Sequence, residues 1–342
     1  MQKKKLENNW IKYLKDTGIK KTIVSKYARY ITRIIDHEYP VIFEFNHLAA
    51  LLGRTNEYLA SVVNSPENHY RIYNIPKRSG GYREISAPYP ALLECQQWIN
   101  KYILSKIKVH EKANGFVHGK SIITNAEKHL GKKCLLKIDL ENYFPSIGIE
   151  KVINIFMECG YPHNVSFYLA RICCLDERLP QGAATSPSLS NIISYGLDSR
   201  LNGLAKKFGI AYTRYADDLT FSGDRISIKT LEIIKGIIEG QGFKVNERKT
   251  HLCRSKGKRI VTGISVADDK LRIPRPYRRK LRQELYYILN YGYISHAKHK
   301  EIGEPFHLDS LYGKLNFWKL VEPNNQYVHQ AIDRIKTLRI KV

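Results

Sequence analysis

The stretch RYADDLTFSG, residues 214–223, places two adjacent carboxylates between two runs of strand-forming residues. Strands are expected over 209–215 and 218–223, and the two residues between them predict a tight hairpin. Asp217 and Asp218 repel each other at its tip, so without a counter-ion one would be pushed toward protonation. Magnesium takes oxygen ligands from one or two carboxylates, so a metal site would remove the conflict. The alternative is a solvated turn.

A third carboxylate lies at the end of another expected strand. KCLLKIDL, residues 133–140, is short and mostly apolar, which is typical of a strand in the middle of a sheet, and it contains Asp139. If this strand lies beside the hairpin, three carboxylates can hold two ions about 3.5–4 Å apart and clamp an in-line phosphoryl displacement. Asp139 and the flanking strands favour the metal site over the solvated turn.

The composition indicates a polyanionic partner. Lys and Arg number 56 against 32 Asp and Glu, a net charge of +24 spread along the 342 residues. A distributed positive surface suits a long nucleic acid better than a small acidic substrate; plain solubilising charge is the alternative. Hydrophobic residues make up 43% of the chain, so we expect a globular protein with two or three sub-domains.

Several other classes of protein are disfavoured. No run of 18 apolar residues occurs, and no apolar signal core follows MQKKKLENNW, so we expect no membrane span and no membrane partner. The six cysteines form no CxxC pair, which indicates reduced thiols in a cytoplasmic protein. His296 and His299 could share a helical turn, but no third ligand is near, which disfavours zinc.

The periodicities predict an α+β chain without internal repeats. Residues 1–65 are expected to be helical; Gly53 would break a helix pair and Thr55 would cap its second member. That outline also fits a helix-turn-helix over 46–63, although a structural brace is favoured. Further strands are expected over 71–75, 82–86, 258–266 and 270–274, extended chain over 243–250, and helices over 90–107, 149–159, 164–174, 186–209, 227–240 and the basic tail from Arg275.

Three motifs together resemble those of reverse transcriptases. YADD (215–218) resembles the YxDD box, KIDLENYFPSI (137–147) the first palm motif, and LPQGAATSPSLSN (179–191) the PQG-x-x-x-SP motif. Their order and spacing are highly specific, and the resemblance covers about residues 70–266. It implies an α+β right-hand polymerase fold with a palm built on an antiparallel sheet. The implied division is a helical N-terminal extension (1–65), fingers (66–132), palm (133–266, with a fingers insertion near 160–190) and a helical basic thumb (267–342).

The resemblance assigns roles to residues at matching motif positions. Asp139, Asp217 and Asp218 would be catalytic and, with the Leu140 carbonyl, would hold two Mg²⁺ ions. Phe144 would exclude a ribose 2′-OH, or else be a core aromatic. The other nucleotide-binding positions are Gln181 and Gly182 in the pocket, Lys77 and Arg83 on the triphosphate, and Lys249 as a proton donor to pyrophosphate. A solvated basic loop is the alternative for Lys77 and Arg83, and a surface lysine for Lys249.

Two further stretches resemble signatures of retron reverse transcriptases. NAEKH resembles their NAxxH signature through Asn125, Ala126 and His129, and Val261, Thr262 and Gly263 form their VTG triplet. The resemblance makes these six residues the candidate signature and RNA-binding positions. This resemblance implies a bacterial enzyme that primes from the 2′-OH of a guanosine in its own structured non-coding RNA. Its product would be branched multicopy single-stranded DNA. The VTG region and the basic tail would hold the RNA hairpin, since aromatic residues among arginines suit stacking on folded RNA.

The resemblance also implies partners and leaves alternatives. The substrates would be deoxynucleoside triphosphates. The chain after the palm is too short for an RNase H domain, so RNase H would act in trans, and a separate effector protein would serve anti-phage defence. One alternative is a group II intron-like or diversity-generating reverse transcriptase that extends a 3′-OH. Others are a non-catalytic RNA-binding scaffold or antitoxin with a polymerase fold, and a helix-turn-helix DNA binder over 46–63.

Overall fold

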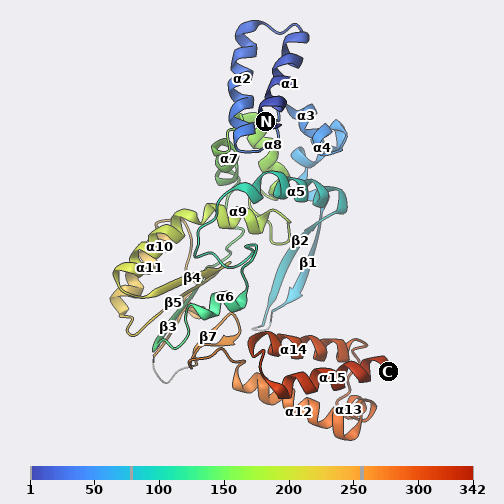
Figure 1. The fold of residues 1–342 in the computed structure, drawn as a ribbon, viewed down its shortest axis with the longest axis vertical. Helices are drawn as coiled ribbons and strands as arrows, with labels where there is room; N and C mark the ends of the chain where they lie inside the picture. The colour runs from blue at the N-terminus through green and yellow to red at the C-terminus, as the bar shows by residue number, and fades with distance from the viewer. Residues whose placement is uncertain (1, 78–79, 255–257, 342) are drawn as a thin grey trace. The chain divides into compact units, whose positions relative to one another are not determined.

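The computed structural model describes residues 2–77, 80–254 and 258–341 (Figure 1). Contacts divide the chain into two compact units. Unit 1 comprises Met1–Phe116, Leu140–Leu201 and Ile234–Asn246, and unit 2 comprises Val117–Asp139, Asn202–Ile233 and Glu247–Val342. Each unit therefore combines segments that lie far apart in the sequence. The boundaries of fingers, palm and thumb stay predictions.

Unit 1 begins with helices, as expected for residues 1–65. Their bounds are α1 Gln2–Asp16, α2 Lys21–Asp36, α3 Phe45–Leu51 and α4 Asn56–Asn64, followed by the 3₁₀ turn η1 Pro66–His69. α2 buries one apolar stripe that includes Val24, Ile31 and Ile35. The Thr55 hydroxyl accepts a hydrogen bond from the Tyr58 N–H, which confirms the predicted helix cap.

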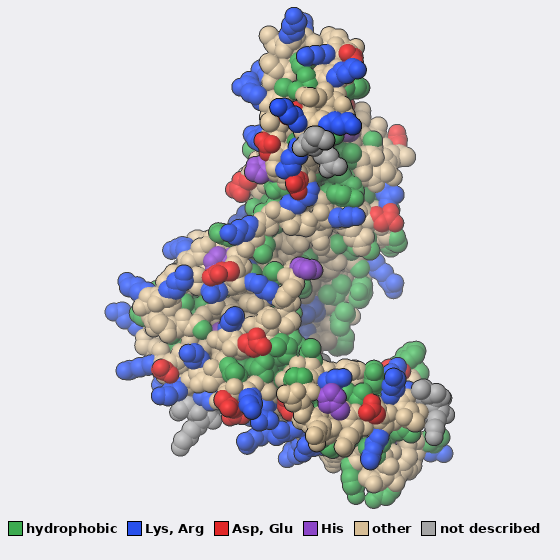
Figure 2. Space-filling model, viewed as in Figure 1, with side chains coloured by type: hydrophobic (Ala, Val, Ile, Leu, Met, Phe, Trp, Pro, Cys, Tyr) green, Lys and Arg blue, Asp and Glu red, His purple; other side chains and the backbone are tan. Residues whose placement is uncertain are grey.

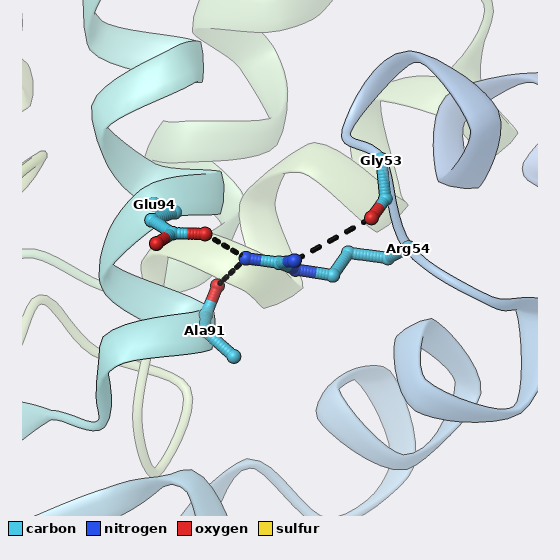
Figure 3. A network of polar contacts seen from close by, with 4 residues as sticks. All are labelled: Gly53, Arg54, Ala91 and Glu94. Atoms are coloured by element: carbon cyan, nitrogen blue, oxygen red, sulfur yellow. Dashed lines mark hydrogen bonds and ion pairs between the residues drawn. The ribbon is translucent and has the colours of Figure 1, made fainter.

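The expected hairpin of unit 1 is confirmed and slightly longer than predicted. β1 (Tyr70–Pro76) and β2 (Tyr82–Pro88) pair antiparallel, and α5 (Pro90–Tyr102) follows, then η2 (Leu104–Lys106). Arg54, in the α3–α4 connection, ties that connection to the start of α5 (Figure 3). Its guanidinium donates to the Gly53 and Ala91 carbonyl oxygens over 3.4 and 3.3 Å and pairs with the Glu94 carboxylate.

The remaining helices of unit 1, the last of which extends past the unit boundary at Leu201, correct one prediction. α7 (Ile149–Glu158) and α8 (His163–Cys173) lie where expected, but the single helix predicted over 186–209 is wrong. It divides into α9 (Ser186–Ile193) and α10 (Tyr195–Lys207), and Ser194 between them has φ −77° and ψ 2°. There the Tyr143 hydroxyl donates to the Ser190 carbonyl oxygen and lies 2.8 Å from the Ser194 hydroxyl. Tyr143 thus contacts both residues at the point where the two helices divide.

Unit 2 contains a four-stranded antiparallel sheet with the order β4-β5-β3-β6. The strands are β3 Cys134–Asp139, β4 Ala211–Tyr215, β5 Asp218–Gly223 and β6 His251–Cys253. β4 and β5 form the predicted tight hairpin, and β3 pairs directly with β5. The expectation that the strand of Asp139 lies beside the hairpin is confirmed.

Several elements of unit 2 outside this sheet pack around an apolar core. They are α6 Ile122–Glu127, β7 Ile260–Val261, β8 Ile264–Ser265, α12 Arg275–Tyr291, α13 Tyr293–His299, α14 His307–Val321 and α15 Gln326–Lys341. The helical tail is thus confirmed. Leu285, Leu315 and Trp318 are buried in one cluster that also includes Ala126 and Val261. This cluster fixes α6 and β7 to the helical tail.

Three predictions for residues 243–274 need correction. The strand expected over 258–266 is a pair of two-residue strands, because Thr262 and Gly263 turn the chain with φ 44° and 83°. Residues 270–274 supply only a bridge from Arg272 to Ser265. The expected extended chain over 243–250 contains the 3₁₀ turn η3 (Glu247–Lys249). Helix α11 (Ile228–Glu239) lies where expected.

The surface agrees with the basic composition. Figure 2 shows many Lys and Arg side chains on the visible face and fewer Asp and Glu. Among the described residues, no helix is long and apolar enough to cross a membrane.

Candidate active site

Strand pairing in unit 2 brings the three predicted carboxylates together. Asp139 is the last residue of β3 and faces Asp218, the first residue of β5, in the antiparallel register. Asp217 precedes Asp218 in the two-residue turn that follows Tyr215 of β4. Residues directly opposite on antiparallel strands have Cβ atoms about 4.5–5.5 Å apart. Two of the carboxylates are therefore cross-strand neighbours, and the third is adjacent in sequence.

The turn that carries Asp217 has a constrained backbone. Ala216 has φ 56°, a left-handed conformation that costs an alanine about 1–2 kcal/mol. Arg214 is fully buried, and its guanidinium donates to the Ala216 carbonyl oxygen over 3.2 Å. This bond helps hold the turn in its less favourable conformation, so the position of Asp217 is defined by the surrounding structure.

Burial and mutual repulsion act on the two carboxyls of the hairpin. Burial raises the pKa of Asp217, and the charges of Asp218 and Asp139 raise it further, while Lys249 lowers it. Burial also raises the pKa of Asp218, against the lowering effect of Lys137, and Asp139 adds to the rise. The folded chain therefore concentrates negative charge at a cost, which is common at functional sites.

Lys249 supplies a cation at this cluster. Its ammonium lies 3.0 Å from both carboxylate oxygens of Asp139, and it projects from η3, the turn that the sequence did not predict. The lysine side chain is 54% exposed, so this ion pair contributes little to stability. The structure thus places Lys249 beside a predicted metal ligand; its role toward pyrophosphate stays a prediction.

The chemistry of the site fits a hard divalent cation. Carboxylate and carbonyl oxygens are the ligands that Mg²⁺ prefers, and Asp139, Asp217, Asp218 and the carbonyl of Leu140 are all of that kind. The fit rests on these donor types and on the neighbouring strand positions. In the part of the chain that the structure describes, no group of three or more His, Cys, Asp or Glu side chains is arranged to hold a metal ion.

The predicted pocket residues Phe144, Gln181 and Gly182 lie in unit 1. The half-buried Phe144 ring lies 6.3 Å from the ring of Phe116, which is 53% exposed. The Gln181 carbonyl oxygen accepts a hydrogen bond from the Ser86 N–H of β2. Gly182 has φ 136°, and a Cβ there would lie 2.6 Å from the Ser86 carbonyl oxygen. Only glycine lets the loop approach β2 so closely.

Lys77 and Arg83 lie at the end of the β1–β2 hairpin where the loop joins the two strands. Arg83 faces Ile75 in the register, the Lys77 N–H donates to the Gly81 carbonyl oxygen, and both side chains are exposed. Exposure leaves both cations available to phosphate, and it also fits a solvated basic loop. The triphosphate role stays a prediction.

Two residues that contact the predicted pocket segments were missed by the sequence reasoning. Gln96 is fully buried, donates to the Tyr70 hydroxyl and the Ile172 carbonyl oxygen, and accepts from the Ala184 N–H in the PQG loop. An amide inside the apolar pattern of α5 was the signal that could have identified it. Phe116 was missed as well; no periodicity distinguishes it.

The two retron signatures meet in unit 2. Asn125, Ala126 and His129 are buried, as is Val261, while Gly263 is exposed. The Thr262 hydroxyl donates to the Ile122 carbonyl oxygen, which joins the VTG turn to helix α6. NAEKH and VTG thus form one contiguous structural feature. The proposed contact with RNA is not tested by this geometry.

The sequence as a whole matches known proteins. A family model described as reverse transcriptase (RNA-dependent DNA polymerase) matches residues 75–274. The chain therefore belongs to the reverse transcriptases, a class of RNA-dependent DNA polymerases. This membership confirms the expected α+β right-hand polymerase fold.

Its relatives narrow the class. The chain is 34% identical over 253 residues to the retron Ec86 reverse transcriptase of Escherichia coli, an alignment that covers 73% of this chain and 79% of that protein. It is 38% identical over 240 residues to the retron Mx65 reverse transcriptase of Myxococcus xanthus, covering 64% and 56%. For the retron Mx162 reverse transcriptase of the same species, the identity is 33% over 290 residues, covering 75% and 58%. The chain thus spans just over half the length of the two Myxococcus relatives.

Proposed function

We propose that Asp139, Asp217 and Asp218 are the catalytic carboxylates of RNA-directed DNA synthesis. The observation that supports this most directly is the register that sets Asp139 opposite Asp218, with Asp217 beside it, in a chain of the reverse transcriptase family. Carboxylates that repel each other and are partly buried gain from a bound cation. They would gain most where nucleic acid and metal meet on a basic protein.

The cofactor we propose is Mg²⁺, in two ions held by the three carboxylates and the Leu140 carbonyl. When bound, the ions would supply Lewis-acid activation of the primer hydroxyl and charge neutralisation on the triphosphate. Proton transfer to the leaving group would come from a side chain of the protein. Lys249, whose ammonium already lies at Asp139, would give a proton to the departing pyrophosphate.

The nucleotide would be selected in unit 1. Phe144 would exclude a ribose 2′-OH, and its half-buried ring beside Phe116 supports an aromatic wall. Gln181 and Gly182 would line the pocket, and Lys77 and Arg83 would bind the triphosphate, lysine as a point charge and arginine as a two-pronged donor. A small residue at position 144 should then admit ribonucleotides.

We further propose that the protein is a cytoplasmic retron enzyme of bacteria. It would bind its cognate structured non-coding RNA, prime from a guanosine 2′-OH and produce branched multicopy single-stranded DNA. The retron names of its relatives support this assignment. RNase H in trans and a separate effector protein would complete an anti-phage system. The basic surface suits the RNA partner.

A first experiment tests the chemistry. Asp217→Ala and Asp218→Ala should each lower primer extension on an RNA template by about 100-fold or more, because each removes a metal ligand. Asp224→Ala is the matched control: Asp224 is an exposed carboxylate directly after β5, and its loss should change the rate by less than about twofold. Polymerisation that persists without Asp217 and Asp218 would refute the assignment.

A second experiment tests the product and separates the alternatives. Nucleic acid that copurifies with the wild-type protein should be a branched RNA–DNA whose junction is cut by a 2′,5′ debranching enzyme. Unbranched cDNA would instead identify an enzyme that extends a 3′-OH. The Asp217→Ala protein should retain RNA and lack DNA, and DNA-free RNA in the wild type would indicate a scaffold. An inverted-repeat RNA cassette beside the coding sequence would agree with the retron.

A further inference from the structure

His129 occupies a position at the catalytic hairpin. Its Nδ1 lies 2.7 Å from the Ser222 hydroxyl of β5, and its Nε2 lies 2.7 Å from the Thr213 hydroxyl of β4. The side chain is fully buried, and both ring nitrogens are occupied by these hydroxyls. Its contacts are therefore with the two strands that carry the YADD turn, within unit 2.

The imidazole has the right chemistry for this place. Burial lowers the pKa of His129 to about 3, so the ring is neutral near pH 7 and has one N–H donor and one acceptor nitrogen. A hydroxyl can donate or accept, so Ser222 and Thr213 satisfy either tautomer. Both bonds are thus made without a buried charge.

The geometry of the hairpin explains what the ring bridges. Thr213 faces Thr220 in the register, and Ser222 lies two residues further along β5. Thr213 and Ser222 are therefore diagonal neighbours on one face, about 7–8 Å apart. One aromatic ring with a nitrogen toward each hydroxyl spans that gap and fixes β4 against β5.

The histidine is itself held firmly. It follows α6, whose start carries a reciprocal cap between Ser121 and Thr124, and whose Ala126 is buried in the apolar cluster of unit 2. The Thr262 bond to the Ile122 carbonyl oxygen fixes the same helix from the VTG turn. The ring is thus attached to a packed element, which a positioning residue requires.

We propose that His129 is a positioning residue for nucleotidyl transfer: it bridges β4 and β5 and thereby sets where the YADD turn presents its carboxylates. The inference rests on the proposed catalytic role of Asp217 and Asp218. It gives the NAxxH histidine a function in catalysis and not in contact with RNA. A misplacement of catalytic ligands by about 1 Å can cost roughly 100-fold in rate.

The test uses the full chain and removes the two bonds one at a time. Thr213→Val and Ser222→Ala each delete one hydroxyl with little change of volume, and His129→Ala deletes both bonds. Each variant should lower kcat for primer extension, by a few-fold for the single hydroxyls and about tenfold for His129→Ala, and leave the KM for the nucleotide and the affinity for RNA within about twofold. His129→Gln, which keeps a donor and an acceptor, should recover part of the loss. If His129→Ala does not fold, the two hydroxyl variants decide.

Two controls separate positioning from general stability. Thr230→Val removes a hydroxyl bond of another buried threonine, to Ser227 on the approach to α11, and should lower the melting temperature without lowering kcat. Adding Thr213→Val to His129→Ala should cost nothing further, because the bond is already lost. The proposal would be overturned if kcat fell in proportion to the melting temperature in all variants, Thr230→Val included. It would also be overturned if the variants lost affinity for RNA and kept the wild-type kcat.

Hydrogen exchange gives a readout that does not depend on catalysis. Amides of the β4–β5 turn should exchange at least about tenfold faster in Thr213→Val and Ser222→Ala than in the wild type, while those of α11 should not change. Unchanged exchange at the turn would refute the bridge. Faster exchange together with an Asp217→Ala enzyme that still polymerises would instead refute the catalytic assignment and leave the bridge standing.

Discussion

At the scale of single residues, the hairpin tip combines charge with constraint. Asp217 and Asp218 are partly buried, and repulsion by neighbouring carboxyls adds to the effect of burial on the pKa of each. Ala216 adopts a left-handed backbone between them and β4. These features lower the stability of the fold. Reaction centres commonly keep such destabilising groups because the same groups are needed for the chemistry.

Neutral amides should therefore stabilise the protein and inactivate it. Asp217→Asn or Asp218→Asn should raise the melting temperature in chelator-treated buffer, because repulsion is removed at nearly constant shape. The same change should lower primer extension by about 100-fold or more. Asp224→Asn, at an exposed position, should alter neither quantity. A fall in melting temperature for both hairpin variants would contradict the electrostatic account.

The same carboxyls predict a pH dependence of stability. Their pKa values are raised in the folded state above the unfolded value of about 3.9, so in the intervening pH range the folded chain binds more protons than the unfolded chain. The contribution of this pair to the free energy of unfolding therefore increases as the pH falls through the raised pKa values. The stability gap between the Asp217→Asn, Asp218→Asn double variant and the wild type should shrink as the pH is lowered from 7 toward 4, as chemical denaturation would measure. A difference in stability that widens as the pH falls would refute this explanation.

At the scale of elements, the sequence predicted what local patterns determine. The strands of YADD, the capping of α4 by Thr55 and the helical tail are confirmed, because turn residues, caps and periodicity act over a few positions. The division of 186–209 at Ser194 coincides with contacts from Tyr143, which is remote in sequence, and a local periodicity does not reveal such a contact. The 3₁₀ turn that brings Lys249 to Asp139 was missed because its local sequence pattern is typical of extended chain.

The close approach of the PQG loop to β2 predicts a sensitive glycine. Gly182→Ala should destabilise the protein by about 1–3 kcal/mol, since the new Cβ would meet the Ser86 carbonyl oxygen at a φ that alanine rarely adopts. It should also raise the KM for the nucleotide, if the loop lines the pocket. Gly203→Ala is the control, because Gly203 lies within α10 and a Cβ added there would meet nothing within 4 Å. That change should add about 0.5–1 kcal/mol of stability. Equal effects at the two positions would refute the steric argument.

At the scale of the whole molecule, charge was predictable and burial was not. The net charge of +24 follows from composition, and Lys and Arg are widespread on the surface in Figure 2. The signature residues Asn125 and His129 were grouped with RNA binding, whereas the structure buries both. The sequence motifs located these two residues together with the VTG triplet. Whether their side chains are buried or exposed depends on the packing of the folded chain, which the motifs do not reveal.

Affinity for structured RNA should depend strongly on salt. An interface that neutralises several phosphates loses about 10³–10⁵ in affinity between 50 and 200 mM salt, and we expect a loss of at least about 100-fold here. Arg275, Arg278 and Arg279 line a surface depression of about 450 Å³ at the start of α12. Changing these three to alanine should flatten the slope of log affinity against log salt. The control is to change the exposed Lys4, Lys5 and Lys12 to alanine, which removes the same charge and should flatten the slope less. Filter binding would measure both slopes, and equal slopes would refute a role for the tail.

The distribution of cysteines has a practical consequence for labelling. All six are free, five are buried, and Cys253 is half-buried. Burial raises the pKa of Cys159 to about 11 and of Cys173 to about 12, so these thiols carry little reactive thiolate. A maleimide probe should therefore attach first at Cys253 on β6, which pairs with Leu135 of the strand that ends at Asp139. The native chain thus offers a reporter group on the sheet that carries the proposed catalytic carboxylates, without any engineered cysteine. The other five thiols should react only when the protein unfolds, so their reactivity would measure unfolding.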